Sequence, residues 1–402
     1  MTEPETFDVV VVGGGPAGAT AAADLAAKGH LVLLLDKAGR IKPCGGAIPP
    51  RLIRDFRIPD DLLCAKISSA RMIPPSGKSV DMPIDNGGYV GMVNRETFDE
   101  WLRVRASQQG AERRRGQFER LSRASDGVSV VHYSPKSASD AAGKPDEVQV
   151  RARVVIGADG AVSGVARAAI PGADKIPFVF AYHEIVRAPA DGPSYDSKRC
   201  DVHYDGRFSP DFYSWVFPHG DTMSIGTGSA NKGFSLRGSV AGLRQHLGLD
   251  EAATIRKEGA PIPLKPLKKW DNGCDVIVIG DAAGVVAPSS GEGIYYAMAC
   301  ARHAADAVHE TLITGDARAL AGARKAFMKA HGRVFWILGV MQWVWYRNDR
   351  LRERFVSICK DKDVQRLTWE SYMNKELVRS DPMAHVRIFF KDLGHLLGVA
   401  RT

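Results

Sequence analysis

Three short motifs of glycine and aspartate carry the clearest chemical information in the sequence. They are a G-x-G-x-x-G run at residues 13–18, Asp159-Gly160 and Gly280-Asp281. Each follows a run of apolar residues that is long enough for a buried parallel strand. Glycine-rich turns after such strands bring main-chain N–H groups close to phosphates. The three motifs together predict a nucleotide-binding α/β domain.

The first motif has the spacing of a pyrophosphate-binding turn. Gly13 permits the tight turn, Gly15 lets the main chain approach the phosphates, and Gly18 allows a helix to pack closely on the strand. An ordinary turn is the alternative. A second apolar run at residues 31–35 ends at Asp36, about 20 residues beyond the glycines, where a carboxylate can bind both ribose hydroxyls. Because an acidic residue disfavours a 2′-phosphate, this site is predicted to bind FAD or NAD, not NADP.

An aromatic segment is the strongest candidate for binding a substrate. Tyr213, Trp215 and Phe217 alternate along a predicted strand, so that their rings fall on one face. Such a face suits a long polyprenyl chain, and the alternative is a sheet face packed against its own core. Pro218 is expected to end the strand.

Two loops could approach a bound cofactor. Cys44 lies in a Pro/Gly-rich stretch at residues 42–50, directly after the first nucleotide-binding unit. A buried structural cysteine is the alternative reading for Cys44. The loop at residues 288–293 precedes a predicted helix and could aim N–H groups at the electron-rich edge of a flavin, or could be a plain turn.

The composition narrows the class of protein. A chain of 402 residues with 45% hydrophobic content fits two globular domains. The six cysteines show no C-x-x-C spacing and no apolar signal segment opens the chain, so we expect a reduced, cytoplasmic setting without disulfides or structural zinc. The net charge of +8 suits nucleic acid, an anionic membrane or an acidic protein, but no nucleic-acid motif accompanies it.

A second aromatic segment occupies residues 334–346, within a C-terminal region that carries 13 Lys/Arg and 8 Asp/Glu from His331 to Thr402. This segment is too short to span a bilayer, which takes about 20 residues. The flanking arginines would let this segment lie in a membrane interface. A buried core helix is an alternative of equal weight.

The rest of the sequence predicts the strands and helices of two interleaved domains, on which the motifs lie. Strands are expected at residues 70–74, 79–83, 89–93, 128–133, 148–150, 178–186, 200–204, 212–217 and 222–228, with a polar loop at 134–147. Helices are expected at residues 95–109 and 293–308, and most of the chain beyond them is expected to be helical.

The fold class is therefore predicted as α/β, with a Rossmann-like domain interleaved with a mainly antiparallel sheet domain. The nucleotide-binding domain is expected at residues 1–70, 95–175 and 265–310, the substrate domain at 71–94 and 176–264, and a helical region at 311–402.

The order and spacing of the three motifs resemble the FAD-binding fold of the aromatic hydroxylase group. In that group the aspartate matching Asp281 binds the ribityl chain or pyrophosphate of the flavin, and the arginine matching Arg95 helps to hold the cofactor. The Asp159-Gly160 turn matches one near the dinucleotide part. A helix N-cap is the structural alternative for Asp281.

Two further segments are similar to geranylgeranyl reductases, K-P-C-G-G at residues 42–46 and Y-S-W-V-F-P at 213–218 followed by Gly226. The sequence P-C-G-G-A-I-P at residues 43–49 resembles that of the geranylgeranyl reductases that form the phytyl tail of chlorophylls and bacteriochlorophylls. This resemblance implies reduction of three of the four double bonds of a geranylgeranyl chain, carried by a diphosphate or by the pigment. It also implies NADPH as electron donor, with reduced ferredoxin left open.

The motifs and the resemblance together predict two sets of functional residues, one catalytic and one that contacts the cofactor. Catalytic roles are expected for Cys44, Tyr213, Trp215 and Phe217. Cofactor contacts are expected from Gly13, Gly15, Pro16, Ala17, Gly18, Asp36, Lys37, Cys44, Gly45, Gly46, Ala47, Arg95, Asp159, Gly160, Gly280, Asp281, Gly291, Gly293 and Ile294.

Two rival functions stay open from the sequence. One is a flavin monooxygenase that hydroxylates an aromatic substrate, and the other is a non-catalytic protein that escorts prenylated molecules. Expected partners are the geranylgeranyl substrate and an electron-donor protein, and the expected location is the cytoplasm, with or without peripheral contact with a photosynthetic membrane.

Overall fold

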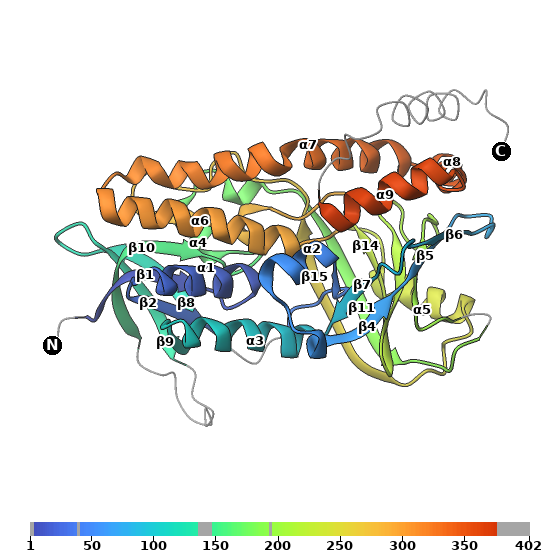
Figure 1. The fold of residues 1–402 in the computed structure, drawn as a ribbon, viewed down its shortest axis with the longest axis horizontal. Helices are drawn as coiled ribbons and strands as arrows, with labels where there is room; N and C mark the ends of the chain where they lie inside the picture. Colours follow the sequence, from blue (N-terminus) through green and yellow to red (C-terminus); the bar gives the residue numbers. More distant parts are fainter. Residues whose placement is uncertain (1–3, 38–40, 136–146, 193–194, 376–402) are drawn as a thin grey trace. The chain divides into compact units, whose positions relative to one another are not determined.

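The computed structural model describes residues 4–37, 41–135, 147–192 and 195–375 (Figure 1). The chain forms two compact units, each assembled from three separate segments. Unit 1 comprises Met1–Ile41, Glu96–Phe178 and Ile262–Arg333, and unit 2 comprises Lys42–Arg95, Val179–Pro261 and Val334–Thr402. Both candidate sites therefore depend on segments that are far apart in the sequence.

Unit 1 is built on a six-stranded sheet of order β1-β2-β8-β9-β10-β16, in which β1 also pairs with β10. The three strands that precede the glycine motifs run parallel, β1 to β10 and β10 to β16. The strands are β1 Thr6–Val12, β2 Val32–Asp36, β8 Glu112–Arg123, β9 Ser129–Pro135, β10 Val148–Gly157 and β16 Val276–Val278. Continuous apolar runs form β1, β2, β16 and the last residues of β10, because these strands are buried on both faces.

Helices cover the sheet of unit 1. The alanine-rich helix α1 packs against α6, since small side chains on both helices permit close approach. The helices of this unit are α1 Pro16–Ala27, α3 Arg95–Gln108, α4 Gly164–Ala169 and α6 Ile294–Thr314, with short 3₁₀ turns at η2 Ala173–Lys175, η3 Gly280–Ala283 and η4 Ala317–Leu320.

Unit 2 contains a seven-stranded sheet of order β15-β11-β14-β13-β12-β5-β6. Helix α5, Leu236–His246, covers a cluster that includes Val216, Ile225 and Leu243. The strands are β5 Ser69–Ile73, β6 Val80–Pro83, β11 Phe178–Arg187, β12 Arg199–His203, β13 Ser214–His219, β14 Thr222–Ser229 and β15 Thr254–Pro263. Because side chains alternate along β13, its aromatic residues lie on the face opposite to Val216.

A small three-stranded sheet completes unit 2. Strand β7 lies between β3 and β4 and pairs antiparallel with both. The elements are β3 Ala47–Ile48, β4 Leu63–Ile67, β7 Val90–Val93, the helix α2 Pro50–Phe56 and the 3₁₀ turn η1 Asp60–Leu62. A cluster around Met92 joins this sheet to Phe217 of β13 and to Trp369 of α9, Lys362–Asn374.

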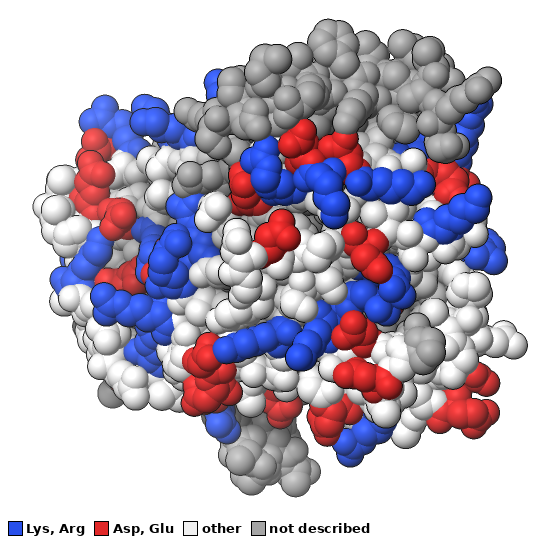
Figure 2. Space-filling view, turned by 45° about the vertical axis from the view of Figure 1, so that its right-hand side comes forward, with Lys and Arg blue, Asp and Glu red and all other residues white. Residues whose placement is uncertain are grey.

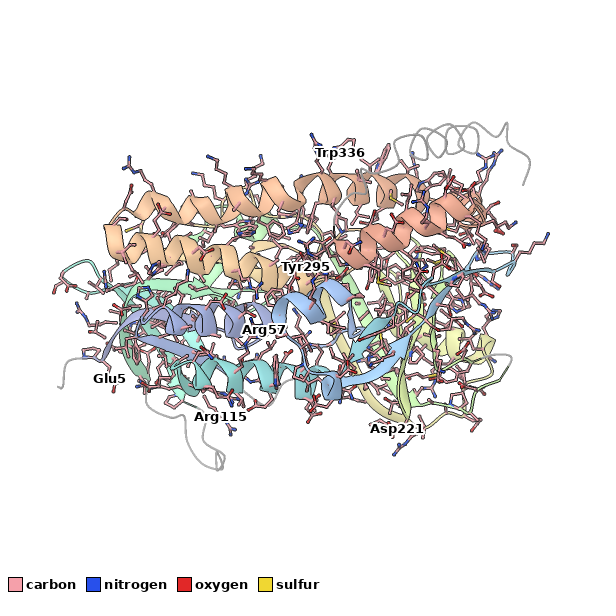
Figure 3. All side chains as sticks on the ribbon, viewed as in Figure 1. Glu5, Arg57, Arg115, Asp221, Tyr295 and Trp336 are labelled. Carbon is pink, nitrogen blue, oxygen red and sulfur yellow. The ribbon has the colours of Figure 1, made fainter. Side chains whose placement is uncertain are left out.

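The C-terminal part of the described chain is helical, as expected. It comprises α7 Ala321–Trp345, α8 Asp349–Ile358 and α9. The aromatic segment on α7 has two faces: Phe335 is buried, whereas the side chains of Trp336 and Trp343 are 70% and 71% exposed. Trp336 is labelled on this helix in Figure 3. No helix within the described ranges is long and apolar enough to cross a membrane.

Most predicted elements are present within one to three residues, but several details differ. Pro218 does not end its strand, because β13 continues to His219 with Pro218 opposite Met223. The second helix runs to Thr314, well beyond residue 308. No strand was predicted from the sequence at β8 or β15. The unit boundaries fall near residues 41, 95, 178, 261 and 333, and the last of these divides α7. Most of the polar loop at residues 134–147 and the end of the C-terminal region lie outside the described residues.

Candidate functional site

The first glycine turn of unit 1 is too tight for side chains. Gly13 follows β1 with φ +108°, and a Cβ there would lie 2.3 Å from the carbonyl oxygen of Ala158. A Cβ on Gly18 would lie 1.8 Å from the carbonyl oxygen of Gly13. Both positions therefore require glycine, one for the turn and one for the contact of α1 with β1, as the spacing predicted.

The same turn leaves room for a ligand at the start of α1. Gly15 is the N-cap residue, without a side-chain cap, and a Cβ there would meet no atom within 4 Å. The Gly14 N–H donates to Asp36 Oδ2 at 2.7 Å, which fixes the carboxylate beside the turn. Pro16 and Ala17 form the first turn of the helix. Open space, a helix N-terminus and a placed carboxylate fit the pyrophosphate and ribose of FAD.

An arginine that was not predicted from the sequence also contacts this turn. Arg103 of α3 donates to the carbonyl oxygen of Gly14 at 3.2 Å and to Glu100 at 3.0 Å. Hydrogen bonds from Arg113 and Arg103 lower the pKa of Glu100 to about 2 against the opposing effect of its burial. The i, i+3 spacing of Glu100 and Arg103 on a helix was the available signal.

The second motif has a visible structural role. The Asp159 carboxylate accepts the Gly164 N–H at 2.6 Å and a hydrogen bond from Ser163, and so caps α4. Burial raises the pKa of Asp159 despite these hydrogen bonds. A Cβ on the neighbouring Gly160 would meet open space. These contacts account for Asp159 structurally, and its contact with a cofactor stays a prediction.

The third motif lies at the end of β16. Gly280 has φ +61° and donates its N–H to Cys300 Sγ at 3.3 Å, and a Cβ on it would lie 2.8 Å from the Cβ of Ala17. Asp281 follows in the first turn of η3. A Cβ on Gly293 would lie 3.7 Å from Asp281 Oδ1. The motif thus lies beside the first turn of α1, as a shared cofactor site requires.

The loop at residues 288–293 leads into α6 without a side-chain cap. Gly291 adopts φ +64° and donates its N–H to the carbonyl oxygen of Ala287 at 2.9 Å. Gly293 is the N-cap residue, and the buried Ile294 begins the helix. The N-terminus of α6 therefore has no side-chain cap, and its dipole would favour an anion or an electron-rich ring.

Within unit 2, the Cys44 loop packs against the end of the aromatic strand. A Cβ on Gly45 would lie 3.0 Å from the Phe217 ring, and one on Gly46 would lie 2.6 Å from His219 Nε2. The Gly46 N–H donates to Cys44 Sγ at 3.3 Å. The two segments that carried the resemblance to geranylgeranyl reductases are therefore neighbours in space.

The predicted aromatic row is present. The ring centroids of Tyr213 and Trp215 are 5.9 Å apart, and those of Trp215 and Phe217 are 6.1 Å apart. Phe212 stacks on Tyr213 at 4.3 Å. Tyr213 and Trp215 are buried, and Phe217 is partly buried. The row therefore forms one face of rings that ends at the Cys44 loop.

Gly226 lies beneath Trp215. A Cβ on Gly226 would lie 2.2 Å from Cζ2 of the indole, so that only glycine lets the ring lie across β14. His219, two residues beyond Phe217, donates from Nδ1 to the Phe217 carbonyl oxygen at 3.1 Å. Burial lowers the pKa of His219 to about 4, so it is neutral near pH 7 with Nε2 as an acceptor.

The other predicted cofactor residues belong to both units. Lys37 is exposed directly after β2 in unit 1. Arg95 is buried as the first residue of α3, and Ala47 belongs to β3, where it pairs with Met92. These positions leave the expected cofactor contacts of Lys37, Arg95 and Ala47 as predictions.

Comparison with known proteins supports the same interpretation. The pyridine nucleotide-disulphide oxidoreductase family matches residues 7–191, and the lycopene cyclase protein family matches residues 230–391. The geranylgeranyl diphosphate reductase of Rhodobacter capsulatus is 59% identical, with 98% of each chain covered. That of Synechocystis is 36% identical, with 97% of each chain covered.

Solved structures share the fold. A geranylgeranyl bacteriochlorophyll reductase-like protein from Thermoplasma acidophilum superposes with a TM-score of 0.81 at 22% identity, over 96% of this chain and 99% of the other. A flavin-dependent brominase superposes with a TM-score of 0.73 at 18% identity, over 96% and 99%. The predicted α/β fold and the resemblance are confirmed, and the chain belongs to the geranylgeranyl diphosphate reductase family.

Proposed function

We propose that the protein is an FAD-dependent reductase that saturates three double bonds of a geranylgeranyl chain to give a phytyl chain. The contact between the Cys44 loop and the aromatic row carries this proposal, because it joins a proton-bearing thiol to a surface suited to a polyprenyl chain. The glycine turn and Asp36 of unit 1 would hold the FAD, and the names of the relatives agree with the substrate class.

The chemistry of the alkene defines what the residues must do. An isolated trisubstituted double bond has no withdrawing group, so protonation must lead or accompany hydride transfer. Bound FAD in its reduced form supplies the hydride. The rings of Tyr213, Trp215 and Phe217 would shield the carbon that gains positive charge, at about 0.5–2 kcal/mol for each well-placed ring. One proton and one hydride together saturate each double bond.

Cys44 is the proposed source of the proton. Its Sγ accepts the Gly46 N–H at 3.3 Å, a hydrogen bond that stabilises the thiolate left after proton transfer. We expect Cys44→Ser to keep FAD and to lose most of the reduction, because a hydroxyl is a much weaker acid. Full FAD occupancy with unchanged double-bond reduction would contradict this role.

The electron donor is proposed as NADPH, with reduced ferredoxin as the other candidate. On the face in Figure 2, Lys and Arg side chains are interspersed with Asp and Glu. The net charge of +8 nevertheless favours an acidic protein donor over a basic one. Anaerobic flavin reduction by each donor, followed by absorbance, distinguishes them.

The test of function is anaerobic incubation of dithionite-reduced protein with geranylgeranyl diphosphate and with a geranylgeranyl pigment in parallel. Mass analysis of the tail should show the gain of up to six hydrogens on at least one substrate. An added oxygen in an aerobic reaction would support the monooxygenase instead. Binding without any mass change would support an escort protein.

The exposed face of α7 supports peripheral contact with a membrane, on its cytoplasmic side. Trp336, Val340 and Trp343 share one face of the helix, and the Arg347 guanidinium lies 5.9 Å from the Trp343 ring centroid. Indole and guanidinium groups both favour the headgroup region. We expect the double variant of Trp336→Ser and Trp343→Ser to bind vesicles of phosphatidylcholine and phosphatidylglycerol at least tenfold more weakly.

The matched control for this membrane test is Ile313→Ser, which removes another exposed apolar side chain, 65% exposed, from the end of α6. Its vesicle binding should equal that of the unmodified protein in the same flotation experiment. Equal binding by the tryptophan variant would contradict a membrane contact through α7.

A further inference from the structure

A chain of hydrogen bonds crosses four neighbouring strands of unit 2 and ends on the indole of Trp215. Trp215 Nε1 lies 3.0 Å from Ser224 Oγ, and Ser224 Oγ lies 2.8 Å from His183 Nδ1. His183 Nε2 lies 3.0 Å from Glu258 Oε2, and Glu258 also forms an ion pair with Arg256. The residues belong in turn to β13, β14, β11 and β15, which are adjacent in the sheet.

Donor and acceptor chemistry sets the direction of this chain. An indole N–H can only donate, so Ser224 Oγ accepts from Trp215. In the His183 tautomer that carries its ring hydrogen on Nε2, the Ser224 hydroxyl donates to Nδ1 and the Nε2–H donates to Glu258. The three bonds point the same way, toward a carboxylate whose pKa is lowered by His183 and Arg256 against the opposing desolvation. Aligned hydrogen bonds polarise one another, which raises the electron density of the indole.

The sheet fixes the ring as well as its N–H. Gly226 lies opposite both Trp215 on β13 and His183 on β11. A Cβ on Gly226 would lie 2.2 Å from Trp215 Cζ2 and 2.6 Å from the Cβ of His183. The indole is therefore held from below by the main chain of Gly226 and at its edge by Ser224, which restricts it to one orientation.

Serine, histidine and glutamate are also the residue types of a hydrolytic triad. Ser224 has no exposed surface, and its oxygen accepts the indole N–H. A buried hydroxyl that is already engaged on both sides cannot attack an ester. The arrangement therefore acts on Trp215 and not on a substrate.

We infer that Ser224, His183 and Glu258 are positioning residues, which orient Trp215 and enrich its ring in electrons at the place where the alkene carbon gains positive charge. The inference rests on the proposed function, because that charge develops only if the protein reduces an isolated alkene. None of the three residues needs to touch the substrate. Their effect on the reaction must pass through Trp215.

The hydrogen bond itself can be tested without any activity. In a ¹H–¹⁵N spectrum, the indole signal of Trp215 is assigned by its loss in Trp215→Phe. Ser224→Ala should shift that signal and speed its exchange with solvent by about tenfold or more, since the acceptor is removed. The matched control is Ser214→Ala, which removes another fully buried hydroxyl of the same sheet, one that bonds to Thr227 at 2.8 Å. This control should leave the Trp215 indole signal in place.

The kinetic test is a double-mutant cycle. Ser224→Ala should lower kcat by about tenfold with KM within about twofold, as expected for a loss of cation–π stabilisation in the transition state alone. In the Trp215→Phe background, Ser224→Ala should have no further effect, because the indole through which it acts is gone. Glu258→Gln keeps the acceptor for His183 and removes only the charge, so its kcat should fall by about two- to fivefold.

The outcomes distinguish a failure of the proposed function from a failure of the positioning role. If the unmodified protein reduces no geranylgeranyl compound, the proposed function fails while the indole signal still tests the hydrogen bond. If it does reduce one and Ser224→Ala changes neither the signal nor kcat, the positioning role is overturned. Additive effects in the Trp215→Phe background overturn it as well. If Ser224→Ala does not fold, the same cycle with Glu258→Gln decides the question.

Discussion

The glycine turn of unit 1 and the aromatic row of unit 2 are built in opposite ways. In unit 1 the main chain forms the candidate site: Gly13 and Gly18 leave no space for a side chain, and Gly15 opens onto free space. In unit 2 the candidate site is formed by side chains, whose aromatic rings contact one another. Position 226 is glycine because the Trp215 ring occupies the space that a side chain would need. The main-chain turn tolerates no side chain at Gly13 or Gly18, whereas a row of side chains can lose one contact at a time.

The largest effect should come from Gly18→Ala. Its Cβ would lie 1.8 Å from the carbonyl oxygen of Gly13, and neither the strand nor the helix can move without opening the turn. Overpacking of this kind costs about 1–3 kcal/mol or more, and here the clash is with main chain. We expect both FAD binding and the thermal unfolding transition of unit 1 to be lost, as measured by flavin absorbance and calorimetry. A variant that folds and binds FAD normally would contradict a main-chain site.

Gly15→Ala should separate FAD binding from folding. The new methyl group meets no protein atom within 4 Å, so the free energy of unfolding should change by less than about 1 kcal/mol. It would occupy the space through which the phosphates approach, and FAD should bind at least about tenfold more weakly. Flavin fluorescence measures this affinity. Gly322→Ala, which also meets no atom within 4 Å, is the control and should bind FAD normally.

Gly226→Ala tests the other region. The methyl group would displace the indole of Trp215 and cost about 1–3 kcal/mol of stability. FAD binding should be unchanged, because the affected residues belong to the aromatic row. We expect kcat for double-bond reduction to fall by about tenfold, measured by mass analysis of the product. A loss of FAD instead would show that the two regions are not separable in the way described.

This difference in construction also decides how much the sequence could predict. The turn at residues 13–18 and the acid at Asp36 lie within one strand-turn-helix-strand unit, so their spacing alone indicates a pyrophosphate site. The alternation of Tyr213, Trp215 and Phe217 is equally local and was predicted correctly. Local patterns were sufficient wherever neighbours in the sequence are neighbours in the site.

The parts that the sequence did not predict depend on which strands become neighbours. Ser224, His183 and Glu258 reach Trp215 only because β13, β14, β11 and β15 are adjacent, an order that no local pattern encodes. The approach of Gly46 to His219 has the same origin. Pro218 was expected to end β13, but pairing with β12 stops at Val216, so Pro218 has a neighbouring strand on one side only and its missing N–H is tolerated.

The smallest predicted effect concerns pH and again distinguishes the two units. Burial lowers the pKa of His203 and of His219, both in unit 2, to about 4 from an ordinary value of 6.5. Between pH 6.5 and 4 the unfolded chain binds protons that the folded chain excludes, so stability must fall as the pH falls through this window. At pH 5.5 the loss should be about 1 kcal/mol for each histidine.

Hydrogen exchange at pH 7 and pH 5.5 locates this loss. His30 and His303 of unit 1 also have a lowered pKa but are only partly buried, so β13 and β14 should lose more protection than β1 and β10. His203→Asn should reduce the difference, because one of the two excluded protons no longer contributes. Equal loss of protection in both units would mean that the side-chain site is no more sensitive to protonation than the main-chain turn, and the contrast between them would then concern packing alone.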